Sequence, residues 1–147
     1  MIDISEKNII PRLAIASGRI KLKKETIKRI RDNTVKKGDV YTIAKIAAIN
    51  SIKSVPYLIP FCHPIPITNV DMNFEIENDT AIKVTTTVKS IAQTGVEMEA
   101  LTGVSIALLN IWDVVKMYEK DENGQYPSAL IYDIKVEKKI KNNSNER

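Results

Sequence analysis

The residues best suited to proton chemistry in this chain lie in one short proline-rich stretch. The only cysteine and the only histidine, Cys62 and His63, stand side by side, and four of the six prolines fall between Pro56 and Pro66. Proline fixes φ and pushes the preceding residue toward extended conformations, so we expect residues 58–66 to form a stiff, extended connector. A histidine held in one direction is a candidate site residue. A structural role is also open, in which His63 caps a neighbouring element and Cys62 packs as a small apolar group.

Charged side chains that could act together with the histidine are spread along the whole chain. If they converge, the cations would hold phosphate groups, and the carboxylates, the histidine and a lysine would move protons. One helix start also favours an anion, because Lys37 and Gly38 precede Asp39, a natural N-cap. Many helix starts carry a lysine without binding anything, so that alternative stays open. The candidate residues are Arg12, Lys37, His63, Glu97, Glu99, Asp113 and Lys116.

Residue types and spacing exclude several familiar kinds of site. One histidine and one cysteine cannot supply the three or four ligands of a His/Cys zinc site. Adjacent residues of an extended segment point to opposite sides, so Cys62 and His63 should not form a nucleophile–base pair. The chain has no Walker loop and no GxGxxG motif, and its few aromatic residues form no RNA-binding signature. We expect neither a metal nor a cofactor.

The composition indicates one globular domain in a reducing compartment. Of the 147 residues, 44% are hydrophobic and 27% are charged, and a single cysteine rules out an internal disulfide. No apolar run approaches the roughly 20 residues that span a bilayer, and the first residues do not resemble a signal peptide. We therefore expect a cytoplasmic protein without membrane contact. The net charge of +4 suits an anionic partner such as a nucleotide, a phosphate ester or nucleic acid, but it also suits mere solubility.

The apolar periodicity predicts the strands and helices that must position these residues. Strands are expected at residues 11–22, 69–77, 81–88 and 129–139, and Gly18 in the first marks a bulge or a close approach. Helices are expected at residues 24–31, from the Asp39 cap to about residue 54, and at residues 94–118. This order predicts an α+β fold, a ferredoxin-like sandwich whose mainly antiparallel sheet has helices packed on one face. Residues 1–141 would form the single domain and residues 142–147 a polar tail.

The long helix predicted at residues 94–118 is apolar all round except for one stripe. Buried charged groups are costly unless they are paired, so this stripe needs a polar cavity, a subunit contact or a ligand. A plainer alternative is a surface pair between Asp113 and Lys116 near the helix end. The stripe consists of Glu99, Gly103, Ile106, Asn110 and Asp113, which recur at helical spacing.

Four motifs follow one another in a fixed order along the chain. They are Lys37-Gly38-Asp39-Val40, Leu58-Ile59-Pro60-Phe61-Cys62-His63-Pro64, Thr94-Gly95-Val96-Glu97-Met98-Glu99-Ala100-Leu101-Thr102 and Asp113-Val114-Val115-Lys116. Each motif alone is weak, but the combination is specific. Together they resemble the cyclic pyranopterin monophosphate synthases of molybdenum cofactor biosynthesis, and the likeness runs from Met1 to about Lys139.

The resemblance implies a ferredoxin-like subunit assembled into a homohexamer, a trimer of dimers, with active sites at subunit interfaces. It also implies a lyase that converts 3′,8-cyclo-7,8-dihydro-GTP to cyclic pyranopterin monophosphate and releases pyrophosphate. The partner would then be a small molecule and not nucleic acid. Two alternatives remain, a non-catalytic ferredoxin-like module that binds a nucleotide or RNA, and a purely structural oligomer subunit.

The resemblance further implies a role for each candidate residue. Arg12 and Lys37 would bind the triphosphate, and Asp113 with Lys116 would form the catalytic acid–base pair. The second catalytic lysine would be Lys139, with Lys138 as the alternative, because the Gly-rich stretch that follows this lysine in many members is absent here. The walls of the substrate site would be Cys62, His63, Glu97, Met98 and Glu99.

Overall fold

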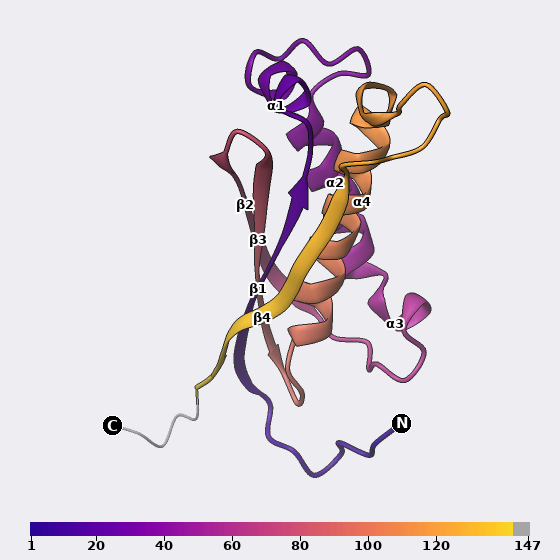
Figure 1. Cartoon of the computed structure of the whole chain (residues 1–147). Coiled ribbons are helices and arrows are strands. Elements are labelled where there is room, and N and C mark those ends of the chain that lie inside the picture. Colours follow the sequence, from indigo (N-terminus) through magenta and orange to yellow (C-terminus); the bar gives the residue numbers. More distant parts are fainter. Residues whose placement is uncertain (143–147) are drawn as a thin grey trace.

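Four strands form the sheet on which the rest of the chain packs (Figure 1). The structure, a computed structural model, describes residues 1–142. Within these residues the strands are β1 (Ile10–Lys21), β2 (Ile67–Asn78), β3 (Ala81–Ala92) and β4 (Leu130–Lys141). Their order in the sheet is β2-β3-β1-β4, and every neighbouring pair is antiparallel. The predicted polar tail lies outside the described residues except for Asn142.

The long helices cover one face of this sheet. In the described chain the helices are α1 (Lys24–Arg31), α2 (Val40–Lys53), α3 (Val55–Leu58) and α4 (Glu97–Glu119). The two long helices, α2 and α4, lie side by side, and α4 packs on the sheet (Figure 1). Element order, strand order and layering together make a ferredoxin-like arrangement, which confirms the predicted α+β sandwich.

Small residues let α4 approach the sheet and α2 closely. A Cβ on Gly18 of β1 would lie 2.8 Å from Leu108 Cδ1 and 2.8 Å from Val104 Cγ1. A Cβ on Gly103 would lie 2.7 Å from Ile52 Cδ1 of α2. The pairing of β1 with β4 also shifts register between Ser17 and Arg19, so Gly18 marks both the close approach and the bulge that its sequence position predicts.

By length and mean hydropathy, α4 is long and apolar enough to cross a membrane. The expectation that no apolar run approaches that length is therefore wrong for this helix. Half of its most apolar window is buried inside the domain, against α2 and the sheet. Such burial is what a core helix of a globular domain shows.

The proline-rich stretch departs from the extended connector expected for residues 58–66. Pro56 stands in the first turn of the short helix α3, where the missing backbone N–H costs nothing. A turn follows, in which the Cys62 N–H donates to the Ile59 carbonyl at 2.9 Å. Proline is favoured at the second position of such a turn, and Pro60 occupies it. Only residues 63–66 run without helix or turn before β2 begins.

A buried carboxylate at the end of α4 caps the start of α1. Glu119 accepts hydrogen bonds from the Lys23 N–H, at 3.2 and 3.1 Å to its two oxygens, and from the Thr26 hydroxyl. Its side chain is only 1% exposed. No side chain within α1 or next to it supplies a cap, so a residue 93 positions away does so.

We expect Glu119→Ala to lower the free energy of unfolding by about 1–3 kcal/mol, because it leaves a buried hydroxyl and a backbone N–H without acceptors. Urea unfolding followed by circular dichroism measures the change. Glu122→Ala, at an exposed loop position, is the matched control and should unfold like the wild type. Equal stability of the Glu119 and Glu122 variants would contradict the capping role.

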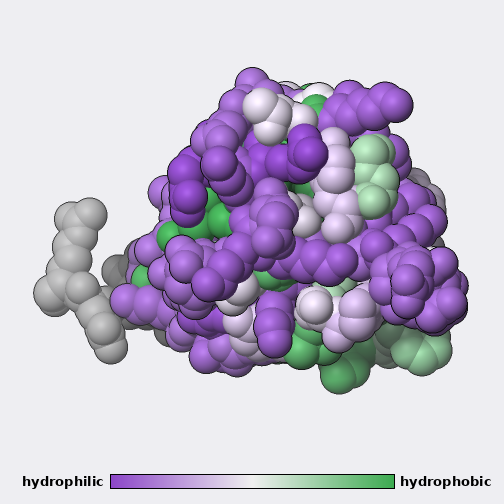
Figure 2. All heavy atoms as spheres, turned by 45° about the horizontal axis from the view of Figure 1, so that its top comes forward, coloured by the Kyte–Doolittle hydropathy of each residue, from purple (hydrophilic) through white to green (hydrophobic). Residues whose placement is uncertain are grey.

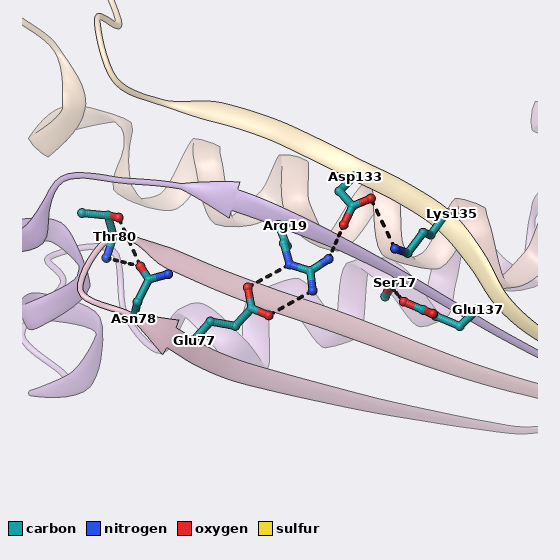
Figure 3. Close-up of polar contacts among 8 residues, drawn as sticks. All are labelled: Ser17, Arg19, Glu77, Asn78, Thr80, Asp133, Lys135 and Glu137. Carbon is teal, nitrogen blue, oxygen red and sulfur yellow. Dashed lines mark hydrogen bonds and ion pairs between the residues drawn. The ribbon is translucent and has the colours of Figure 1, made fainter.

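Charged side chains on the open face of the sheet fix the register of the edge strand β4 (Figure 3). Arg19 of β1 forms a two-pronged bond with Glu77, at 2.8 and 3.0 Å, and also binds Asp133 of β4. Ser17 donates to Glu137 at 2.5 Å. Asp133 and Glu137 stand at the two places where β4 slips against β1, so each irregularity is tied down by a β1 side chain.

Candidate active site

Helix α4 does not reach one end of the sheet. Beyond its first turn, the face of the sheet that carries the helices is uncovered. The sequence predicts β3 to end near residue 88 and β4 near residue 139, but they run on to Ala92 and Lys141. Arg12 of β1 lies opposite Lys141, and Ala14 lies opposite Lys139. Residues two apart on a strand share a face, and directly paired residues of neighbouring strands do so too. Arg12, Lys139 and Lys141 therefore point to the same face of the sheet as α4, at the end that α4 does not cover.

These cations border a cavity of about 570 Å³, here called the basic hollow. The Arg12 guanidinium is held in place by the carbonyls of Ala92, at 3.3 Å, and Gln93, at 3.1 Å. Lys139 forms an ion pair with Glu97, whereas Lys138 does not line the cavity. The lining residues are Glu6, Lys7, Asn8, Ile10, Arg12, Gln93, Thr94, Gly95, Lys139 and Lys141.

A second cavity of about 580 Å³, here called the apolar hollow, adjoins the first and shares Lys7, Thr94 and Gly95 with it. Cys62 and His63 both line it, although an extended segment would have pointed them apart. The turn that ends at Cys62 breaks the alternation and brings both to one side. The lining residues are Met1, Ile2, Ile4, Lys7, Phe61, Cys62, His63, Ile65, Thr94, Gly95, Glu97, Met98 and Glu99.

The glycine of the third motif makes room for a carboxylate between the two hollows. A Cβ on Gly95 would lie 1.9 Å from Glu97 Oε2, so the Glu97 side chain folds back over the glycine. Burial raises the pKa of Glu97, but the hydrogen bond from Lys139 and the charge of Arg12 outweigh it and hold this pKa below its ordinary value. Glu97 is therefore an ionised partner for Lys139.

Glu99 is in the opposite situation, because it is 3% exposed and no lysine or arginine of the described chain lies within ion-pair distance of it. Burial raises the pKa of Glu99 above its ordinary value, and the negative charge of Glu97 adds to the effect. Burial, with a contribution from Glu99, likewise raises the pKa of the Cys62 thiol, so this cysteine is not an activated nucleophile.

We expect Glu99→Gln to become progressively more stable than the wild type as pH rises. A carboxyl whose folded pKa is raised stabilises the fold below its unfolded pKa, near 4.5, and loses that contribution as pH climbs through the folded value. Thermal unfolding of both proteins between pH 4 and pH 8 would show the gap widening. Glu75→Gln, at an exposed position of β2, is the matched surface control. Parallel curves for Glu99→Gln would contradict the raised pKa.

Three further predicted residues meet near the other end of α4, and we call them the lysine–aspartate cluster. Lys116 Nζ lies 2.7 Å from Asp113 Oδ1, and Lys37 Nζ lies 3.3 Å from Asp113 Oδ2 and 3.0 Å from its backbone oxygen. The hydrogen bonds from Lys116 and then Lys37 lower the pKa of Asp113, and the bond to Asp113 raises the pKa of Lys116. Lys116 is thus held as a cation. The Asp113 side chain is 58% exposed, so the cluster faces outward.

The turn before α2 aims Lys37 at this cluster. Gly38 has φ of 117°, which a residue with a side chain rarely adopts. Tyr118 of α4 accepts a hydrogen bond from the Lys36 N–H at 2.9 Å. Asp39 caps α2 as predicted, but it thereby occupies the Tyr41 and Thr42 amides that an anion would need. The helix start is therefore not a free anion site.

Sequence reasoning missed the aromatic residues beside the cluster. Trp112 and Tyr126 pack edge to face, with ring centroids 5.3 Å apart, and border a shallow cavity of about 370 Å³ together with Asp113 and Lys116. Tyr126 comes from the loop before β4, and nothing in its local sequence indicates this contact.

Figure 2 shows the end of the molecule that carries α1 and the neighbouring turns, where hydrophilic residues dominate and hydrophobic ones form separate patches.

The structure therefore divides the predicted site residues into two groups. Arg12, Cys62, His63, Glu97, Met98, Glu99 and Lys139 lie at the N-terminal end of α4, and Lys37, Asp113 and Lys116 lie toward its C-terminal end. Glu97 and Asp113 are sixteen residues apart on one helix, so about 24 Å separates them along its axis. Within residues 1–142, no three His, Cys, Asp or Glu side chains are grouped so that they could hold a metal ion.

Comparison with known proteins identifies the family. A model of the MoaC family matches residues 1–142. The chain belongs to the MoaC family. This confirms the resemblance drawn from the four ordered motifs.

MoaC family relatives match this chain almost from end to end. One from Sulfolobus acidocaldarius is 56% identical over 141 residues, which cover 96% of this chain and 98% of the relative. One from Sulfurisphaera tokodaii is 55% identical, with 96% and 93% covered, and one from Pyrococcus abyssi is 53% identical, with 99% and 91% covered. Each of these relatives is named as a probable cyclic pyranopterin monophosphate synthase.

Proposed function

We propose that this chain converts 3′,8-cyclo-7,8-dihydro-GTP to cyclic pyranopterin monophosphate, with release of pyrophosphate, as a lyase of molybdenum cofactor biosynthesis. The observation that carries the proposal is the family match over residues 1–142, with relatives that bear the name of this synthase. The geometry supports it, because a basic hollow beside an apolar one suits a molecule with a triphosphate at one end and a ring system at the other. With a single thiol, Cys62, the protein suits the reducing cytoplasm.

We further propose that each active site is shared between two subunits of a homohexamer, a trimer of dimers. The lysine–aspartate cluster and the two hollows cannot serve one small substrate within a chain, because about 24 Å of helix separates them. Both groups are open to solvent and therefore accessible to a second subunit. A symmetric contact would bring the cluster of one chain to the hollows of its neighbour.

In such a site the cations hold the triphosphate and stabilise the leaving pyrophosphate. A substrate hydroxyl oxygen attacks the phosphorus nearest the sugar and loses its proton to solvent. The bond to pyrophosphate breaks with its electron pair on the departing oxygen. Arg12, already oriented by two carbonyls, presents a rigid guanidinium, while Lys37 acts as a point charge. The charge that builds up on the leaving group is what these residues offset.

The acid–base steps fall to Lys116, Asp113 and Lys139. Opening the guanine-derived ring requires protons delivered to nitrogen and removed from oxygen. Lys116, kept protonated by Asp113, is placed to donate a proton, and Asp113 fixes its direction. Lys139, paired with the ionised Glu97, is the second lysine of this proposal.

The test is to incubate the purified full chain with the cyclised GTP derivative, without any other protein or redox reagent. We expect equimolar cyclic pyranopterin monophosphate and pyrophosphate, measured by mass spectrometry and by a coupled phosphate assay. Tight binding without product would instead favour a non-catalytic nucleotide-binding module. Neither binding nor product would favour a purely structural subunit.

A further inference from the structure

The segment before β1 crosses the end of the sheet and is fastened there. The Gln93 side-chain amide donates to the carbonyl oxygens of Ile4, at 3.2 Å, and Ser5, at 3.4 Å. The Lys7 N–H then closes a turn on the Ile4 carbonyl at 3.0 Å. Gln93 follows directly on the end of β3, so a rigid strand end sets the position of the segment.

This anchorage places Lys7 at the junction of the two hollows. Lys7 is the only charged residue that lines both, since the other shared residues are Thr94 and Gly95. Within residues 1–142, no carboxylate lies within ion-pair distance of Lys7, whereas Lys139 is already paired with Glu97. A lysine that lines a cavity and has no carboxylate partner is available to an anionic ligand.

The basic hollow carries more positive charge than its own acidic residues balance. Four cations line it, Lys7, Arg12, Lys139 and Lys141, against Glu6 on the wall and the Glu97 partner of Lys139. Of the four, only Lys7 also borders the apolar hollow. A ligand with its phosphates in one cavity and its ring in the other must therefore pass Lys7.

We propose that Lys7 is a further phosphate-binding residue, which contacts the substrate where its phosphate chain meets the rest of the molecule. The segment of residues 1–9, fastened by Gln93, is then part of the active site. The inference rests on the proposed function for the identity of the substrate. The phosphate contact itself can be measured without turnover.

The experiment is calorimetric titration of the purified full chain with inorganic tripolyphosphate. We expect Lys7→Ala to weaken its affinity about tenfold or more, the usual effect of losing one charge-assisted hydrogen bond. Lys7→Arg should retain most of the affinity. Lys28→Ala removes an exposed lysine of α1, outside both hollows, and should bind like the wild type.

The outcomes separate this inference from the proposed function. Wild-type affinity in Lys7→Ala, or an equal loss in Lys28→Ala, would overturn the role of Lys7 and leave the proposed function intact. Tripolyphosphate binding that depends on Lys7 in a protein that makes no product would support the contact and remove the proposed reaction. Because Lys7 is exposed, the thermal unfolding temperature of the free Lys7→Ala variant should equal that of the wild type.

Discussion

Replacement of Lys116 by alanine should lower turnover of the cyclised GTP derivative by about 10²- to 10⁴-fold, the usual contribution of a general acid or base. The lysine is held as a cation by Asp113, 2.7 Å away, and both groups face outward from α4. Its side chain contributes little to the core, so the variant should fold and unfold like the wild type. Single-turnover rates with saturating substrate, together with thermal unfolding, measure both quantities.

The control for this change is Lys120→Ala, one turn further along the chain and exposed just after α4 ends. It should keep the wild-type rate. His63→Ala, which alters a wall of the apolar hollow, should slow the reaction or weaken substrate binding by less than Lys116→Ala does. If Lys116→Ala keeps more than roughly a tenth of the wild-type rate, this lysine is not the acid or base. An equal loss in His63→Ala would make the histidine the better candidate.

Replacement of Lys139 by alanine should reduce turnover by about 10²-fold, because it removes the proposed second proton-transferring lysine and leaves Glu97 without its partner. The neighbouring lysine gives an internal control. Residues adjacent on a strand point to opposite faces, and Lys138 does not line the basic hollow. Lys138→Ala should therefore react at close to the wild-type rate.

The same assay distinguishes the two lysines. A larger loss in Lys138→Ala than in Lys139→Ala would mean that the register of β4 in the proposed oligomer differs from that of the single chain. The hydrogen bonds of Arg19 to Asp133 and of Ser17 to Glu137 argue against such a change of register, since they fix both irregularities in the pairing of β4 with β1 (Figure 3). The Ser17–Glu137 tie lies only two residues before Lys139.

The parts of the fold that sequence predicts well are those with local causes. Asp39 caps α2 because its carboxylate reaches amides only two and three residues ahead. Gly18 marks a close approach because any side chain there would strike α4. The sheet follows in the same way from residues that alternate along each strand. The four motifs identify the family because their order does not depend on how the chain folds.

The parts that sequence does not predict depend on distant contacts. Glu119 falls just beyond the helix end predicted at residue 118, yet it is buried because it caps a helix 93 positions earlier. The turn that brings Cys62 and His63 to one cavity depends on where Pro60 falls relative to α3. Lys7 lies five positions before Arg12, and only the Gln93 anchor brings it to the hollows. The separation of the candidate residues into two groups becomes visible only once α4 has a defined length.

Because the lysine–aspartate cluster lies far from the two hollows in one chain, the proposed reaction requires that two subunits share each active site. Mixing two inactive variants tests this sharing most directly. Lys116→Ala removes a lysine from the lysine–aspartate cluster alone, and Lys139→Ala removes a lysine from the basic hollow alone. Co-expressed in equal amounts and purified as mixed oligomers, they should regain about a quarter of the wild-type rate, because a shared site then draws one intact half from each of two subunits. If the mixed oligomers are no more active than each variant purified on its own, each active site is built from a single chain.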